Sequence, residues 1–124
     1  MTARPASMRH SLGDYVDQVK RKEQFLAGHP DVSILLDPKA PPHSRWRGHV
    51  PGCAEVTSHE LGQVLDQLDD LVAARDAHVR WPNWTFTRKL SGWQAQQTDG
   101  QELLLGRTLE QVEAQIAQYE RLSS

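Results

Sequence analysis

Three histidines and the single cysteine are the residues of this chain whose types and spacing suggest chemistry. They are His43, His49, Cys53 and His59, and they fall within seventeen positions. Imidazole and thiolate groups bind zinc, and a histidine beside a cysteine can activate the thiol as a nucleophile. The spacing H-x5-H-x3-C-x5-H matches no common zinc pattern, and Cys53 after Pro-Gly is typical of a small buried strand residue. We therefore expect no metal, no cofactor and no catalytic residue. An enzyme or metal protein that uses Cys53, His49 and His59 stays open as a third hypothesis.

Basic and aromatic side chains form the second candidate group. If Trp46 points inward in a strand, Arg45, Arg47 and His49 point together to the opposite face. Arginine supplies forked donors for carboxylate or phosphate, which favours an interaction surface, and a solvated outer face is the alternative. Trp81 lies at a helix–strand corner and is the best candidate for an exposed aromatic residue. The predicted partner-binding residues are Arg45, Arg47, His49, Trp81, Arg88 and Lys89.

Composition limits the class of protein. The 124 residues carry a net charge of −2, and a mean hydropathy of −0.62 describes a polar chain without a global basic field. This acidic balance weakens the case for a dedicated nucleic-acid binder. No apolar run approaches the roughly 20 residues that span a bilayer, and no apolar signal-peptide segment follows the first residues. With one cysteine and no internal disulfide, we expect a cytoplasmic protein without a membrane partner.

The chain repeats itself. WPNWTF (residues 81–86) echoes HPDVSI (residues 29–34), and LEQVEAQIAQY (residues 109–119) echoes LGQVLDQLDDL (residues 61–71). Trp46 and Trp93 are 47 residues apart and occupy equivalent places in the two copies. Each copy must bury the same kind of apolar face. Two related half-sites favour a binding module over a catalytic centre.

Apolar periodicity and turn residues predict the element order α-βββ-α-βββ-α. Helices are expected over about residues 11–27, from 57 or 58 to 78, and from 109 onward, and strands over residues 31–36, 45–50, 53–56, 84–89, 93–97 and 102–106. The fold class is α+β: tandem duplicated βββα units preceded by an N-terminal helix, with antiparallel sheets and helices packed on one face. The expected organisation is a disordered tail (residues 1–10), an N-terminal helix (11–28), a first βββα unit (29–79) and a second (80–124), in one compact pseudo-symmetric domain.

The first two predicted helices carry opposite charges. Lys20-Arg21-Lys22 lies in the first helix, and the second is acidic, with Glu60, Asp66, Asp69, Asp70 and Asp76. Three consecutive cations spread around a helix are typical of a solvated surface. Pairing of the two helices, within one chain or between two chains, is the alternative, and such pairs set orientation more than stability. The spacings Thr57-x-x-Glu60 and Thr108-x-x-Gln111 predict capped starts for the second and third helices.

WRGHVPGCAEVTSHELGQVLDQL (residues 46–68) resembles the core of HicB-type antitoxins, where a strand ending in Pro-Gly-Cys precedes a short strand and a helix with a Leu-rich face. Pro51, Gly52 and Cys53 match the first part. GRTLEQVEAQI (residues 106–116) is similar to the family's Gly-x-Thr-Leu-Glu helix start. The first copy lacks the usual Gly-Asp-Thr, the second lacks Pro-Gly-Cys, and no separate DNA-binding segment is evident. The resemblance implies a βββα fold that binds a partner protein without catalysis.

Two function hypotheses precede the enzyme or metal hypothesis given above. The first is a non-catalytic cytoplasmic protein-binding or regulatory module, antitoxin-like and not an enzyme. The alternative is a nucleic-acid-binding regulatory protein that uses a local basic sheet face (Arg45, Arg47, Arg88 and Lys89), with Trp81 stacking on bases. The expected partners are a protein or, in the alternative, nucleic acid, and a homodimer is compatible with either.

Overall fold

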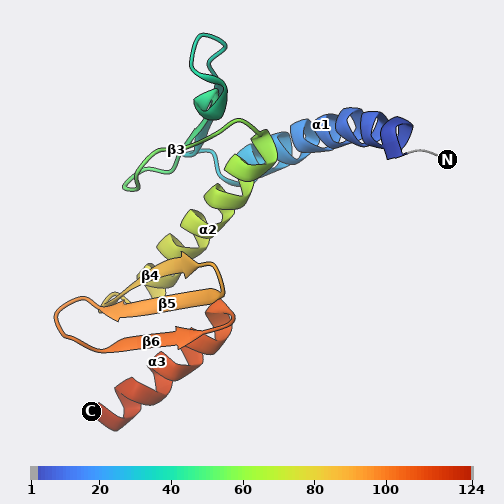
Figure 1. Cartoon of the computed structure of the whole chain (residues 1–124). Helices are drawn as coiled ribbons and strands as arrows, with labels where there is room; N and C mark the ends of the chain where they lie inside the picture. Colours follow the sequence, from blue (N-terminus) through green and yellow to red (C-terminus); the bar gives the residue numbers. More distant parts are fainter. Residues whose placement is uncertain (1–2, 124) are drawn as a thin grey trace. The chain divides into compact units, whose positions relative to one another are not determined.

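The computed structural model describes the backbone of residues 3–123 and the side chains of residues 15–122. Over this range the fold is α+β, with three α-helices and two three-stranded antiparallel sheets, as predicted (Figure 1). The chain divides into two compact units, Met1–Asp69 and Asp70–Ser124. The division falls inside α2 (Leu61–Arg80), whereas we expected a boundary at residues 79/80 within one compact domain. Each half of this helix contributes to a different core, so the helix belongs to both units.

The first unit contains α1 (Ala3–Gly28), β1 (Ser33–Leu36), a 3-10 turn (Pro42–Ser44), β2 (Trp46–His49), β3 (Val56–Ser58) and the first half of α2. The strand order is β1-β2-β3, and Trp46 of the central strand lies opposite Leu36 and Ser58. A Cβ atom on Gly48 would lie 2.8 Å from side-chain atoms of Val64 and Leu68. The missing side chain therefore lets α2 pack closely on β2.

The second unit contains the second half of α2, β4 (Trp84–Lys89), β5 (Gly92–Gln97), β6 (Leu103–Gly106) and α3 (Leu109–Ser123). The sheet is a meander of order β4-β5-β6, and α3 packs on β5 and β6 (Figure 1). Thr108 caps α3 as predicted, because its Oγ1 accepts the backbone N–H of Gln111 at 3.1 Å. The buried core of this unit consists of Ala77, Trp84, Phe86, Trp93, Ala95, Val112 and Ile116.

The predicted burial of the two repeated tryptophans is confirmed. Trp46 and Trp93 lie on the central strands β2 and β5 and are both buried. Trp93 packs in one cluster with Val112 and Ile116, from the apolar face of the helix that follows its sheet. In each unit a helix thus covers one face of the sheet, and the other face is left to solvent.

The start of the chain differs from the sequence-based expectation. α1 begins at Ala3, so residues 3–10 of the expected disordered tail are helical, and residues 1–2 lie outside the described part. Pro5 falls in the first turn, where a missing N–H breaks no helical hydrogen bond. In the described part of α1, Tyr15 and Val16 are about half exposed and Phe25 is buried.

α2 begins at Leu61, later than expected, and β3 occupies part of the predicted helix start. The Thr57–Glu60 capping box does not form. Ser58 Oγ instead accepts the backbone N–H of Glu60 at 3.2 Å and donates to the side chain of Gln63. The hydroxyl one residue further along the chain therefore organises this helix start.

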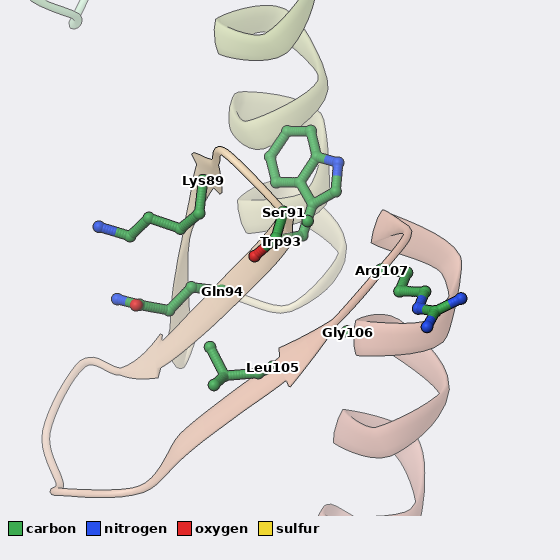
Figure 2. Close-up of a pocket in the computed structure, with 8 residues that line it drawn as sticks. Lys89, Ser91, Trp93, Gln94, Leu105, Gly106 and Arg107 are labelled. Carbon is green, nitrogen blue, oxygen red and sulfur yellow. The ribbon is translucent and has the colours of Figure 1, made fainter.

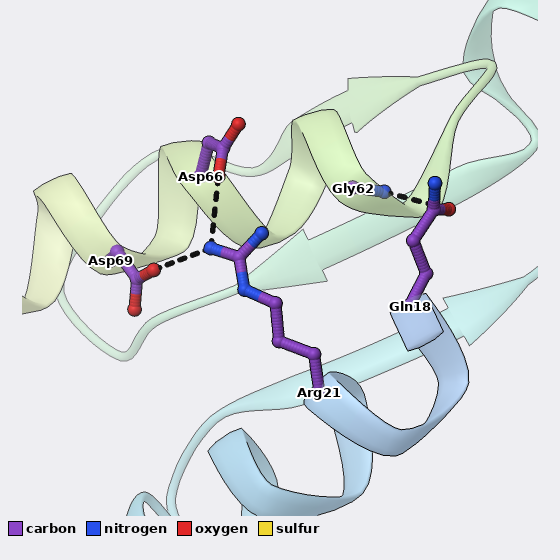
Figure 3. Close-up of polar contacts among 5 residues, drawn as sticks. All are labelled: Gln18, Arg21, Gly62, Asp66 and Asp69. Carbon is purple, nitrogen blue, oxygen red and sulfur yellow. Dashed lines mark hydrogen bonds and ion pairs between the residues drawn. The ribbon is translucent and has the colours of Figure 1, made fainter. Parts of the chain in front are cut away.

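α1 and α2 are joined within the first unit by ion pairs, the alternative that the sequence left open. Arg21 Nη2 lies 2.6 Å from Asp69 Oδ2 and 2.8 Å from Asp66 Oδ1 (Figure 3). One turn away, Gln18 Oε1 accepts the backbone N–H of Gly62 at 3.1 Å, one of the donors left open at the start of α2. Partial burial lowers the pKa of Arg21, but the hydrogen bonds to Asp69 and Asp66 outweigh it and raise the pKa above its ordinary value.

Truncation of Trp93 to alanine should strongly destabilise the second unit. The side chain is 6% exposed, and loss of a buried aromatic ring costs about 3–5 kcal/mol of unfolding free energy. Urea unfolding followed by circular dichroism measures the change. Gln118→Ala on the exposed side of α3 is the matched control. If both variants unfold at the same urea concentration, the ring does not hold this core.

Arg21→Ala should cost less than about 1 kcal/mol, because all three charged groups are substantially exposed to water. The difference from the unchanged protein should shrink in 1 M salt, where the Debye length falls to about 3 Å. Lys20→Ala, which removes a neighbouring exposed cation, is the control. Equal losses from both variants at every salt concentration would contradict a specific role for Arg21.

Candidate functional site

The expected basic row of the first unit is present, but one of its arginines is paired with a carboxylate of the same unit. Arg45 is exposed and its Nε donates to the Ala40 carbonyl at 3.2 Å. Arg47 is half-buried, with Nη2 3.7 Å from Asp37 Oδ2. His49 is exposed at the end of β2. The alternation is as predicted, since the residues between them are buried, yet the carboxylate of Asp37 offsets the charge of the central arginine.

The histidines and Cys53 do not form a cluster. His59 Nε2 lies 3.4 Å from Glu60 Oε1, its sequence neighbour. Among the described residues, no group of three or more His, Cys, Asp or Glu side chains is placed to hold a metal ion. The turn after β2 separates Cys53 from the strand that carries His49. The metal form of the third hypothesis therefore has no candidate site among the described residues.

The aromatic candidate of the second unit is not free. Trp81 is half-buried against the unit's core, and its Nε1 donates to Glu113 Oε1 at 3.1 Å. Arg80 Nε donates to the same oxygen at 2.6 Å, and this hydrogen bond raises the pKa of Arg80 above its ordinary value. The expectation of an exposed aromatic residue at Trp81 was wrong, because Glu113 of α3 holds the indole N–H.

Arg88 and Lys89, adjacent in sequence, face opposite sides of their sheet. Arg88 lies opposite Trp93 in the strand pairing, and its guanidinium carbon stands 5.9 Å from the centre of that ring. Lys89 points to the other side, together with Gln94 and Leu105 (Figure 2). The two cations therefore do not add to one basic stripe.

The face of the second sheet that turns away from the core is the most distinctive surface of this unit. We call it the outer face. Thr87, Gln94 and Leu105 lie side by side across the three strands, and Thr85, Gln96 and Leu103 form the next row. Leu105 is 61% exposed and Leu103 is 45% exposed. Neutral polar groups and aliphatic side chains thus share the outer face.

An open pocket of about 520 Å³ lies at one end of the outer face (Figure 2). It spans the β4–β5 turn and the connection from β6 to α3. Lys89 and Arg107 bring the only charges to its lining, and both are positive. Figure 2 shows Lys89, Gln94 and Leu105 on one side of the sheet and Arg107 on the other. The lining residues are Lys89, Ser91, Gly92, Trp93, Gln94, Leu105, Gly106 and Arg107.

Two glycines shape this end of the sheet. A Cβ atom on Gly92 would overlap the carbonyl oxygen of Gly106 and lie 3.0 Å from Arg107 Cα. A Cβ atom on Gly106 would lie 2.9 Å from Val112 Cγ2. The start of β5, the end of β6 and the first turn of α3 therefore approach one another at backbone distance.

The sequence analysis missed Leu103 and Leu105 as surface residues. The signal was available: three consecutive leucines in one strand cannot all point inward, because successive side chains alternate between faces. Gln94, Gln96 and two threonines make the rest of the outer face rich in amides and hydroxyls. What the alternation rule left open was which of the three leucines would face the core.

Comparison with known proteins identifies no relative: no protein-family model, curated protein or solved structure matches this chain. None of the helices in the described part of the chain is both long and apolar enough to cross a membrane. The outer face must therefore be interpreted from its own chemistry.

Gly92→Ala should destabilise the second unit by about 1–3 kcal/mol, because the added methyl group collides with backbone atoms that cannot rotate away. Thermal unfolding measures the loss. Gly28→Ala is the matched control, since a Cβ atom there meets no atom within 4 Å. Equal melting temperatures for Gly92→Ala and the unchanged protein would show that the close approach is not required.

Proposed function

We propose that this chain is a non-catalytic protein-binding module of the cytoplasm and that the outer face of its second unit receives the partner. The observation that carries the proposal is the exposure of Leu103 and Leu105 beside an open pocket. Exposed aliphatic side chains rimmed by polar groups are typical of protein interaction sites. The single cysteine agrees with a reducing compartment.

The chemistry of the outer face favours protein over nucleic acid. Its threonine hydroxyls and glutamine amides donate and accept hydrogen bonds without attracting phosphate specifically. Aliphatic leucines bury against apolar side chains, whereas single-stranded nucleic acids are held by aromatic stacking and a basic groove. Trp81 is hydrogen-bonded to Glu113, and Arg88 stands over Trp93. The nucleic-acid alternative therefore has the weaker support.

The repeat and the antitoxin resemblance belong to the same proposal. Gly48 and Val56 pair in the first sheet as Ala95 and Leu104 pair in the second, which supports a duplicated βββα unit. A HicB-like module would bind a protein without catalysing a reaction, as the outer face suggests. We propose that the two copies diverged, because the first outer face carries Arg47 and the second carries leucines.

Lys89→Glu should abolish partner capture without changing stability. The residue is exposed at the rim of the pocket, and a reversed charge there opposes a partner selected by the positive lining. Affinity capture from the source cell with the unchanged protein should recover one dominant protein that the variant does not retain. Arg45→Ala is the comparison, because it tests the first unit's basic row instead.

If Lys89→Glu still captures the partner protein and Arg45→Ala does not, the binding site lies in the first unit instead. Capture of nucleic acid alone, with affinity that falls steeply as salt rises, would favour the alternative function.

A further inference from the structure

The pairing of β5 with β6 determines which backbone groups of β6 face the open edge of the second sheet. Gln97 N–H donates to the Glu102 carbonyl at 2.9 Å, so these residues form a hydrogen-bonded pair. Such pairs alternate along an antiparallel ladder. Leu104 and Gly106 therefore bond to β5, whereas the N–H and C=O groups of Leu103 and Leu105 point to the open edge. The hydrogen bond from Gln115 Nε2 to the Leu105 carbonyl, at 2.7 Å, agrees with this assignment.

The two edges of this sheet differ in how they are protected. On β4, the outward carbonyl of Trp84 contacts His78 Nδ1 at 2.6 Å, and Arg88 and Lys89 occupy the end of the strand. Charged residues on an edge strand oppose pairing with another strand. β6 has the sequence Leu-Leu-Leu-Gly and carries no charge. An edge that is apolar and uncharged, and whose Leu105 carbonyl keeps a second lone pair beside Gln115, is the one suited to strand addition.

We propose that β6 pairs antiparallel with β6 of a second copy of this chain. In this arrangement Leu103 of each copy lies opposite Leu105 of the other, and both form hydrogen-bonded pairs through their edge-facing groups. A two-fold axis perpendicular to the sheet passes between the two Leu104 residues, which keeps the outer faces of both copies on the same side. The Leu105 carbonyl has two lone pairs, so it can keep Gln115 and accept a second N–H.

Charge complementarity favours a second copy of the chain as the partner of the β6 edge. Glu102 precedes β6 and Arg107 follows it. In this register Glu102 of each copy lies opposite Gly106 of the other, one residue from Arg107, at both ends of the paired segment. Figure 2 shows Arg107 directed away from the side of Leu105, toward the side on which α3 lies. By alternation Glu102 falls on that same side, so the opposite charges can meet.

This pairing joins two three-stranded sheets into one of six strands. Leu103 and Leu105 of both copies then form one apolar strip on a continuous outer face. Two strands of four residues bury less than the roughly 1,200–2,000 Å² of a stable interface. We therefore expect a weak, concentration-dependent dimer rather than a permanent one.

Sedimentation velocity of the full chain, from about 10 µM to 1 mM, tests the pairing over the range of weak interfaces. Leu103→Lys should raise the dimer Kd at least about tenfold, because each copy places a lysine in the paired edge. Leu122→Lys, at an exposed leucine of α3, should leave the Kd unchanged. Circular dichroism should show that both variants stay folded.

A charge exchange tests the identity of the partner strand. Glu102→Arg alone and Arg107→Glu alone should each weaken the dimer, and the double variant should restore it, because only two copies of one strand place these residues together. A monomer at every concentration, equal effects of both lysine variants, or no restoration would overturn the proposal. Partner capture by the outer face is measured separately with Lys89→Glu, so either proposal can fail alone.

Discussion

A three-stranded sheet that is covered by one helix can bury only one of its faces, and most features of this protein follow from that constraint. In the second unit, α3 and the end of α2 cover the face that carries Trp84 and Trp93. The opposite face carries exposed residues of β4 and β6, among them Thr85, Thr87, Leu103 and Leu105. A sheet of this size has no second layer to hide apolar groups, so Leu103 and Leu105 remain on the surface. The candidate site is therefore a direct consequence of how little the unit can bury.

Internal pairing removes many of the charged groups from the list of binding residues. Arg21 holds two aspartates of α2, Arg47 lies beside Asp37, and Arg80 shares Glu113 with the indole of Trp81. The pairs of Arg21 contribute little to the free energy of unfolding, because their groups are substantially exposed to water. Their effect is to orient the two helices. The pocket at the end of the second outer face differs, since its two cations have no carboxylate among the lining residues.

The two sheets share a strand order but expose different chemistry. The outer side of the first sheet carries Arg47 and His49 beside Leu35, and that of the second carries amides, threonines and leucines. Strand order and a buried tryptophan on the central strand are demands of the core, and they are alike in both units. Outer-face residues are free of those demands, so selection for binding can change them without loss of the fold.

Local physical chemistry determined much of this protein from the sequence alone. Period-2 alternation placed Trp46 and Trp93 inside, β4 was expected over the residues it occupies, and Thr108 caps α3 as its spacing predicts. These features depend on neighbours within a few residues. Only the tertiary structure decided that Trp81 is held by Glu113, that α2 serves two units, and that Leu103 and Leu105 face solvent. Those outcomes depend on which distant element packs against each residue, and periodicity within one element carries no information about its neighbour.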